Sequence, residues 1–231
     1  VEHARRGAAG AGGGEREPEA RKRVVVDRLE GQRADLRQVE RLGFRAEDVT
    51  DVVLTHLDLD HAGGLRDFPH ARVHVLRSEL EAARATRTSI ERTRYPRAQW
   101  AHGPRWVTHD PQGDDWFGFT AVRELPGVPA DVRLIPLAGH TVGHTGVAVR
   151  VGDGWLLHAG DAYFHHAEMH PNPACPPGLR YMQARMETAR GLRLANQDRL
   201  RELVREHGDR VTVFSAHDAV ELRALQRQPV A

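Results

Sequence analysis

The stretch THLDLDHAGG, residues 55–64, places two histidines and two aspartates within six positions and ends in a glycine pair. It follows the apolar run VVL, residues 52–54, which is typical of a short buried strand. Histidine and aspartate are common metal ligands, and functional side chains are often carried on the loops that leave a strand. The stretch therefore predicts one part of a metal site at the end of a strand.

The side chains of this stretch have a predicted direction. Alternate side chains of an extended chain share one face, so His56, Asp58 and Asp60 are expected to point the same way. His61 follows as the chain turns, and the glycines at 63–64 permit a tight bend. Four groups from one loop can begin a metal site, but other segments must complete it.

Three further segments bring metal-binding residue types to the predicted ends of strands. GHTVGH, residues 139–144, lies between two apolar runs and offers His140 and His144. Asp161 ends the apolar run GWLLHAG, and His217 follows the apolar run VTVFSA. A single histidine at a strand end is usually a surface residue or a satisfied core group. The four motifs together predict a shared metal site in an open cleft.

Predicted strands and helices alternate along the chain, which favours an α/β layered fold. Apolar runs predict strands at 51–55, 72–76, 131–137, 145–151, 154–160 and 211–217. Amphipathic patterns predict helices at about 34–42, 78–85, 196–208 and 220–226. Residues 1–23 are rich in glycine and mixed charge, so we expect a disordered tail followed by a single domain over 24–231.

Composition argues against several classes of function. The net charge is +1, which does not favour a nucleic-acid or an anionic membrane partner. No apolar run approaches the roughly 20 residues of a membrane span, and the first residues lack an apolar signal-peptide core. The single cysteine, Cys175, cannot form an internal disulfide, which fits a cytoplasmic location. A small-molecule substrate is therefore the expected partner.

The order of the four motifs resembles that of the metallo-β-lactamase superfamily, over about residues 34–231. The resemblance implies an αββα sandwich with a dinuclear metal centre in a shallow groove at one sheet edge. It implies that His56, Asp58 and His144 hold the first metal, that Asp60, His61 and His217 hold the second, and that Asp161 bridges the two. It implies a supporting position beside the ligands for His140.

Two features of the chain depart from that family's pattern. The pattern is usually His-x-His-x-Asp-His, and Asp58 stands in place of the middle histidine. A carboxylate is a harder and more negative ligand than histidine, which favours iron or manganese. Zinc is still the metal expected first, with iron or manganese as the alternatives. Exchanging Asp58 for histidine should then favour zinc. The family also begins with hairpin strands, of which only VVVDR (24–28) is a counterpart here, so part of the N-terminal sheet is expected to be missing.

The resemblance implies a metal-dependent hydrolase that cleaves a lactone, thioester or ester with a hydroxide shared by two metals. Asp60 is expected to orient the nucleophile or move its proton. Lactonases of the family carry a tyrosine three residues after the bridging aspartate, where this chain has Phe164. Tyr163, one position earlier, is the candidate donor to the substrate carbonyl, with an aromatic packing role as the alternative.

Two other functional classes stay open from the sequence. Asp58 resembles the carboxylate of flavodiiron proteins, which suggests an iron-dependent redox or oxygen-handling enzyme. The missing front strands suggest a non-catalytic descendant that keeps the metal ligands. The arginine-rich and aromatic segment 94–106 fits either a lid over the pocket or an ordinary surface loop, and we favour the loop.

Overall fold

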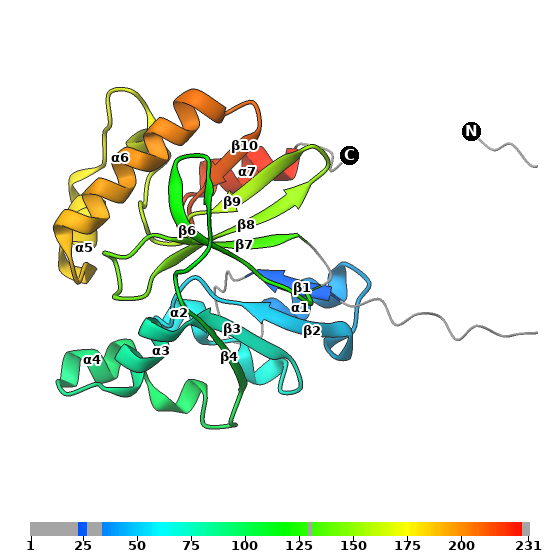
Figure 1. The fold of residues 1–231 in the computed structure, drawn as a ribbon. Coiled ribbons are helices and arrows are strands. Elements are labelled where there is room, and N and C mark those ends of the chain that lie inside the picture. Colours follow the sequence, from blue (N-terminus) through cyan, green and yellow to red (C-terminus); the bar gives the residue numbers. More distant parts are fainter. Residues whose placement is uncertain (1–22, 27–33, 129–130, 228–231) are drawn as a thin grey trace, which may run out of the picture.

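Two β-sheets lie face to face, and helices cover the outer side of each sheet (Figure 1). The computed structural model describes residues 23–26, 34–128 and 131–227. The predicted αββα sandwich is confirmed. The tail predicted over residues 1–23 falls almost entirely outside the described residues. Among the described helices, none combines the length and the apolar character that crossing a bilayer requires.

The first sheet consists of parallel strands in the order β1-β2-β3-β4. A parallel sheet is covered on both faces, which explains why VVL and its neighbours are continuously apolar. Residues 24–26 of the VVVDR segment lie in β1, which pairs with β2, and residues 27 and 28 fall outside the described residues. The strands are β1 (Arg23–Val26), β2 (Val49–Val53), β3 (Arg72–Leu76) and β4 (Arg105–His109).

The second sheet has the order β10-β9-β8-β7-β6-β5. The neighbouring strands β9 and β10 pair in parallel, and the other neighbouring strands pair antiparallel. A two-residue turn at Gly152 and Asp153 joins β8 to β9, and Gly152 adopts the positive φ of +55° that such a turn favours. The strands are β5 (Asp114–Trp116), β6 (Phe119–Glu124), β7 (Val132–Pro136), β8 (Thr145–Val151), β9 (Gly154–His158) and β10 (Val211–Phe214).

Seven α-helices occur among the described residues, and the longest, α6, lies along the outer side of the second sheet (Figure 1). Their bounds are α1 (Ala34–Arg41), α2 (Leu59–Ala62), α3 (Arg77–Arg84), α4 (Ser89–Arg94), α5 (Pro177–Met186), α6 (Arg190–His207) and α7 (Ala219–Arg227). The sequence did not predict α2, α4, α5 or strands β4, β5 and β6. The segment 94–106 spans the end of α4 and the start of β4 rather than one loop.

Three apolar clusters hold the layers together. Val53 and Leu134 belong to a cluster between the two sheets. Leu80 on α3 packs with the outer face of the first sheet, and Leu200 on α6 packs with the outer face of the second. Burial of each large aliphatic side chain stabilises the fold by about 1.5–3 kcal/mol. The layers therefore form a rigid frame whose edge carries the polar loops.

Candidate metal centre

The predicted metal-binding residues meet at one edge of the sandwich. The HLDLDH segment follows the carboxyl end of β2 and continues into α2, and Asp161 follows β9. His217 follows β10, which runs parallel to β9, so the ends of these two strands lie side by side. The loop between β7 and β8 contributes His140. Four segments distant in sequence thus deliver side chains to one place.

Three overlapping groups of these side chains are close enough to share a metal ion. Within each group, one ligand atom from every residue lies within 4.8 Å of the others. The buried carboxylate of Asp161 lies centrally, with Oδ1 at 3.2 Å from His61 Nε2 and Oδ2 at 3.1 Å from His217 Nε2. The groups are His56, Asp58 and His140; His56, His61 and Asp161; and Asp60, His61 and His217.

The buried nitrogen of His56 supports a cation at this place. His56 Nε2 makes no hydrogen bond to any described residue, and Asp58 Oδ2 and Asp161 Oδ2 lie 3.6 and 3.9 Å away. A buried polar atom without a partner costs about 1–3 kcal/mol. A metal ion accepts the lone pair of a neutral imidazole and attracts the nearby carboxylates, so these residues fit a divalent ion.

The protonation states also fit a metal site. Burial, with help from the charge of His61, lowers the pKa of His56 to about 4, so this imidazole is neutral at pH 7. Burial raises the pKa of Asp161, but the neighbouring His61 and His140 outweigh it and hold the pKa well below its usual range. Neutral imidazole and ionised carboxylate are the forms that bind metals.

The two histidines of GHTVGH have different surroundings from those expected. His140 Nε2 lies 3.0 Å from Asp58 Oδ2 and 3.3 Å from Asp161 Oδ2, within the cluster. His144 Nδ1 is 3.0 Å from the Leu137 carbonyl, and its Nε2 accepts the backbone N–H of Asp161 at 2.9 Å. Both ring nitrogens of His144 are therefore used by backbone groups. This arrangement differs from the one expected for His144, because His140 is the histidine of this motif that lies in the cluster.

Two glycines fix the path of this loop. Gly139 has φ +142°, and an added Cβ would lie 2.4 Å from the backbone nitrogen of Arg193 in α6. An added Cβ at Gly143 would lie 2.3 Å from the backbone nitrogen of Glu79 in α3. The loop is therefore held between one helix from each side of the sandwich. This packing fixes the backbone on both sides of His140.

Tyr163 does not lie where a carbonyl donor is needed. Its side chain is fully buried in the core beneath the second sheet, and its hydroxyl donates to Glu221 Oε1 on α7 at 2.9 Å. Tyr163 is thus directed away from the cluster, which fits the packing alternative. Phe164 points the other way, with its ring centroid 4.9 Å from that of His217 and 6.1 Å from that of His140.

Arg94 is a site residue that the sequence reasoning missed. It ends α4, and its guanidinium reaches Asp58 from 36 positions away, with Nε 2.5 Å from Oδ1 and Nη2 2.7 Å from Oδ2. The spacing of Arg94 gives no sign of this contact. The sequence did contain a helix signal, because Thr88 and Glu91 form a capping box at the start of α4.

Glu79 is a second missed residue, and it joins two of the ligand-bearing loops. Its fully buried carboxylate accepts the backbone N–H of Leu57 at 3.0 Å through Oε1 and that of Gly143 at 2.9 Å through Oε2. Burial raises the pKa of this carboxyl, and the two backbone N–H groups act against that rise. Glu79 therefore holds the HLDLDH and GHTVGH loops at a fixed separation.

Replacing Glu79 by glutamine is expected to destabilise the protein. The amide nitrogen would face the N–H of either Leu57 or Gly143, so one acceptor is lost and two donors meet in a buried place. We expect a loss of about 1–3 kcal/mol in the free energy of unfolding. Urea denaturation measures the change, with Glu81→Gln on the exposed side of α3 as the matched control. Equal stability of the two variants would contradict this role.

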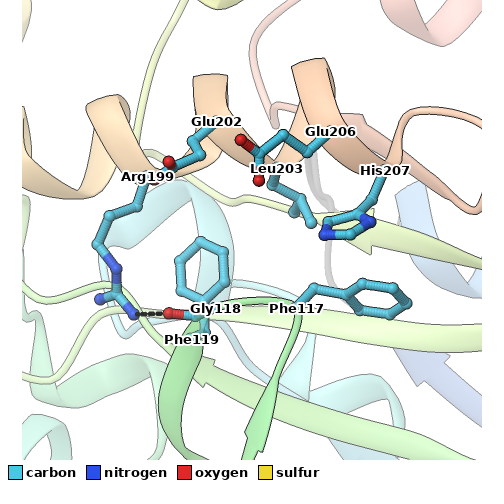
Figure 2. Close-up of a pocket in the computed structure, with 8 residues that line it drawn as sticks. All are labelled: Phe117, Gly118, Phe119, Arg199, Glu202, Leu203, Glu206 and His207. Carbon is cyan, nitrogen blue, oxygen red and sulfur yellow. Dashed lines mark hydrogen bonds between the residues drawn. The ribbon is translucent and has the colours of Figure 1, made fainter.

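A separate cavity of about 230 Å³ lies between the β5–β6 hairpin and α6. Figure 2 shows Arg199 beside the ring of Phe119 and donating to the carbonyl of Gly118, at 3.2 Å. Glu202 and Glu206 also line it. None of the clustered histidines or aspartates lines this cavity, so it is not the candidate site.

Comparison with known proteins agrees with this geometry. A family model described as the metallo-beta-lactamase superfamily matches residues 12–201. A "Probable metallo-hydrolase" of Mycobacterium tuberculosis is 42% identical over 182 residues, covering 79% of this chain and 59% of the relative. The chain thus spans less than two thirds of that relative's length. An N-acyl homoserine lactonase of Agrobacterium fabrum is 50% identical over 46 residues, 20% of this chain and 18% of the lactonase.

A solved structure shares the fold at low sequence identity. A dizinc quorum-quenching lactonase in complex with its product superposes with a TM-score of 0.60 at 18% identity, covering 84% of this chain and 68% of the other. Such identity supports the fold alone. The family match extends over most of the chain and includes the HLDLDH and GHTVGH motifs and Asp161. The chain belongs to the metallo-beta-lactamase superfamily.

Proposed function

We propose that this chain is a metal-dependent hydrolase of a small ester-like substrate, with a lactone as the preferred class. The observation that carries the proposal is the convergence of imidazoles and carboxylates from four segments of the chain, with the buried carboxylate of Asp161 at the centre. The relatives named for metallo-hydrolase and lactonase activity support it. We further propose that residues 24–231 act as one domain.

The residues divide between two proposed metal positions. A dinuclear centre fits because the groups overlap at His56, His61 and Asp161 rather than forming one isolated set. We propose zinc as the metal, with iron and manganese as the alternatives that metal analysis separates. The first position is assigned to His56, His140 and Asp58, the second to Asp60, His61 and His217, and the bridge to Asp161.

The chemistry follows from what surrounds these positions. Bound divalent ions lower the pKa of water and polarise a carbonyl oxygen, which together promote hydrolysis near neutral pH. Asp60 has a half-exposed side chain, with Oδ2 3.6 Å from both His61 Nε2 and His217 Nε2, so it can accept a proton and pass it to solvent. The ring of Phe164 supplies an apolar wall beside His217 that limits the access of bulk water.

A metal and substrate screen tests this function. The protein purified without chelator should contain about two divalent ions per chain and should hydrolyse N-acyl homoserine lactones or other lactones faster than phosphodiesters. Removal of the metal by chelation should abolish turnover, and zinc should restore it. Stoichiometric iron without lactone, ester or thioester turnover would favour the redox alternative. A metal-loaded protein that is inert on the whole panel would favour a non-catalytic descendant.

A further inference from the structure

Arg94 is the one arginine whose guanidinium enters the metal cluster among the described residues, and its side chain is only 12% exposed. Arg94 donates from Nε to Asp58 Oδ1 and from Nη2 to Asp58 Oδ2. This is the bidentate geometry of the strongest arginine–carboxylate pairs. Nη1 donates to the Met186 carbonyl at 2.6 Å. Nη2 lies 3.2 Å from the His140 carbonyl and 3.0 Å from His140 Nε2.

These contacts show what Arg94 is built to do. Its donors are directed at acceptors of the protein in the HLDLDH loop, the GHTVGH loop and the end of α5. A guanidinium satisfied in this way is not an open binding group for an anionic substrate. Its position instead fixes the orientation of the Asp58 carboxylate, whose Oδ2 also lies 3.0 Å from His140 Nε2.

Charge gives the pairing a further consequence. A histidine at position 58, as in the usual pattern of the superfamily, would contribute a neutral imidazole to the first metal position. Asp58 carries one negative charge and Arg94 one positive charge, so the pair as a whole is also neutral. A buried charge without its partner is strongly destabilising. Neither member of the pair can therefore be exchanged alone without leaving a buried charge next to the metal ligands.

We propose that Asp58 and Arg94 act as one neutral unit that replaces the histidine of the superfamily pattern, with Arg94 as the positioning residue that aims Asp58 at the first metal position. The proposal rests on the proposed function, because it presumes that the cluster binds metal. It makes Arg94 a determinant of metal affinity and metal choice. Hydrogen-bonded partners of metal ligands commonly change metal affinity by about 10–100-fold when removed.

The single substitutions Asp58→His and Arg94→Met are both expected to weaken metal binding, for opposite reasons. In Asp58→His the guanidinium of Arg94 loses its carboxylate and stands unpaired beside the metal ligands, so one metal position should weaken by about 10–100-fold. In Arg94→Met the carboxylate of Asp58 is neither oriented nor neutralised, so zinc affinity should fall by a similar factor. Manganese should gain relative to zinc in this variant, because a free carboxylate is a hard ligand.

The double variant Asp58→His/Arg94→Met removes both charges together and should recover most of the affinity. Zinc binding to the chelator-stripped proteins is titrated against a competing chelator, and metal content is measured by mass spectrometry. Circular dichroism of each metal-free protein checks the fold. Arg92→Met, on the exposed side of α4, is the matched control and should bind as the parent does. Arg94→Lys keeps the charge without the fork and should fall between parent and Arg94→Met.

The double variant decides the proposal. Recovery to within about threefold of the parent supports the neutral unit, because independent sites would instead show additive losses. If the double variant loses as much affinity as the two single variants combined, the pairing is overturned while the proposed function stands. If the parent protein itself binds no divalent metal, the proposed function fails and this proposal fails with it.

Discussion

Replacing Asp161 by alanine is expected to remove most of the hydrolytic activity and to lower the metal content below two ions per chain. The carboxylate of Asp161 is within 3.1–3.3 Å of ring nitrogens from His61, His140 and His217. Without it, these imidazoles face one another with no shared anion. A loss of several kcal/mol of transition-state stabilisation corresponds to about 10³-fold or more in kcat/KM.

The fold should survive this substitution. The backbone N–H of Asp161 donates to His144 and is not altered by the substitution. Asp153→Ala is a matched control, because Asp153 also follows a glycine but lies exposed in the β8–β9 turn. Near-normal turnover and metal content in Asp161→Ala would show that the bridging assignment is incorrect.

The second large effect separates the two histidines of GHTVGH. His144→Ala should destabilise even the metal-free protein, because it leaves the N–H of Asp161 and the carbonyl of Leu137 unpaired and opens a cavity. We expect a loss of about 2–5 kcal/mol, the range for buried large-to-small changes. His140→Ala should instead remove one metal ion, with a much smaller change in the stability of the metal-free protein.

Denaturant unfolding in the presence of chelator, together with metal analysis, distinguishes the two variants. The stability in chelator reports the structural role of His144 without any contribution from bound ions. The metal content of His140→Ala reports the ligand role. If His144→Ala were as stable as the parent in chelator and lacked one ion, His144 would be the ligand and the proposed assignment of His140 would be incorrect.

The sequence alone predicted the layered α/β fold and the edge on which the cluster lies. Continuous apolar runs identified β2, β3, β7, β8, β9 and β10, because each of these strands contributes side chains to an apolar cluster. The order of motifs indicated His56, Asp60, His61, Asp161 and His217, all of which the structure brings together. Strand ends and ligand-type residues are properties of local sequence, so local patterns predict them.

Only the tertiary structure decided how the remaining side chains are directed. The choice between His140 and His144 depends on a loop clamped by α3 and α6, and no spacing within GHTVGH encodes that contact. Tyr163 and Phe164 are neighbours in sequence, and packing against Glu221 and His217 sends them in opposite directions.

The meaning of Asp58 also changed with the structure. From the sequence alone, Asp58 is an added negative ligand that favours a harder metal. In the structure Asp58 pairs with Arg94, so the two side chains together are neutral, and that argument for iron no longer applies. The partner comes from the end of a helix that the chain reaches 36 positions later. The charge balance of a buried site depends on which side chains lie next to one another in the fold. The sequence pattern gives the residue types but not these spatial neighbours.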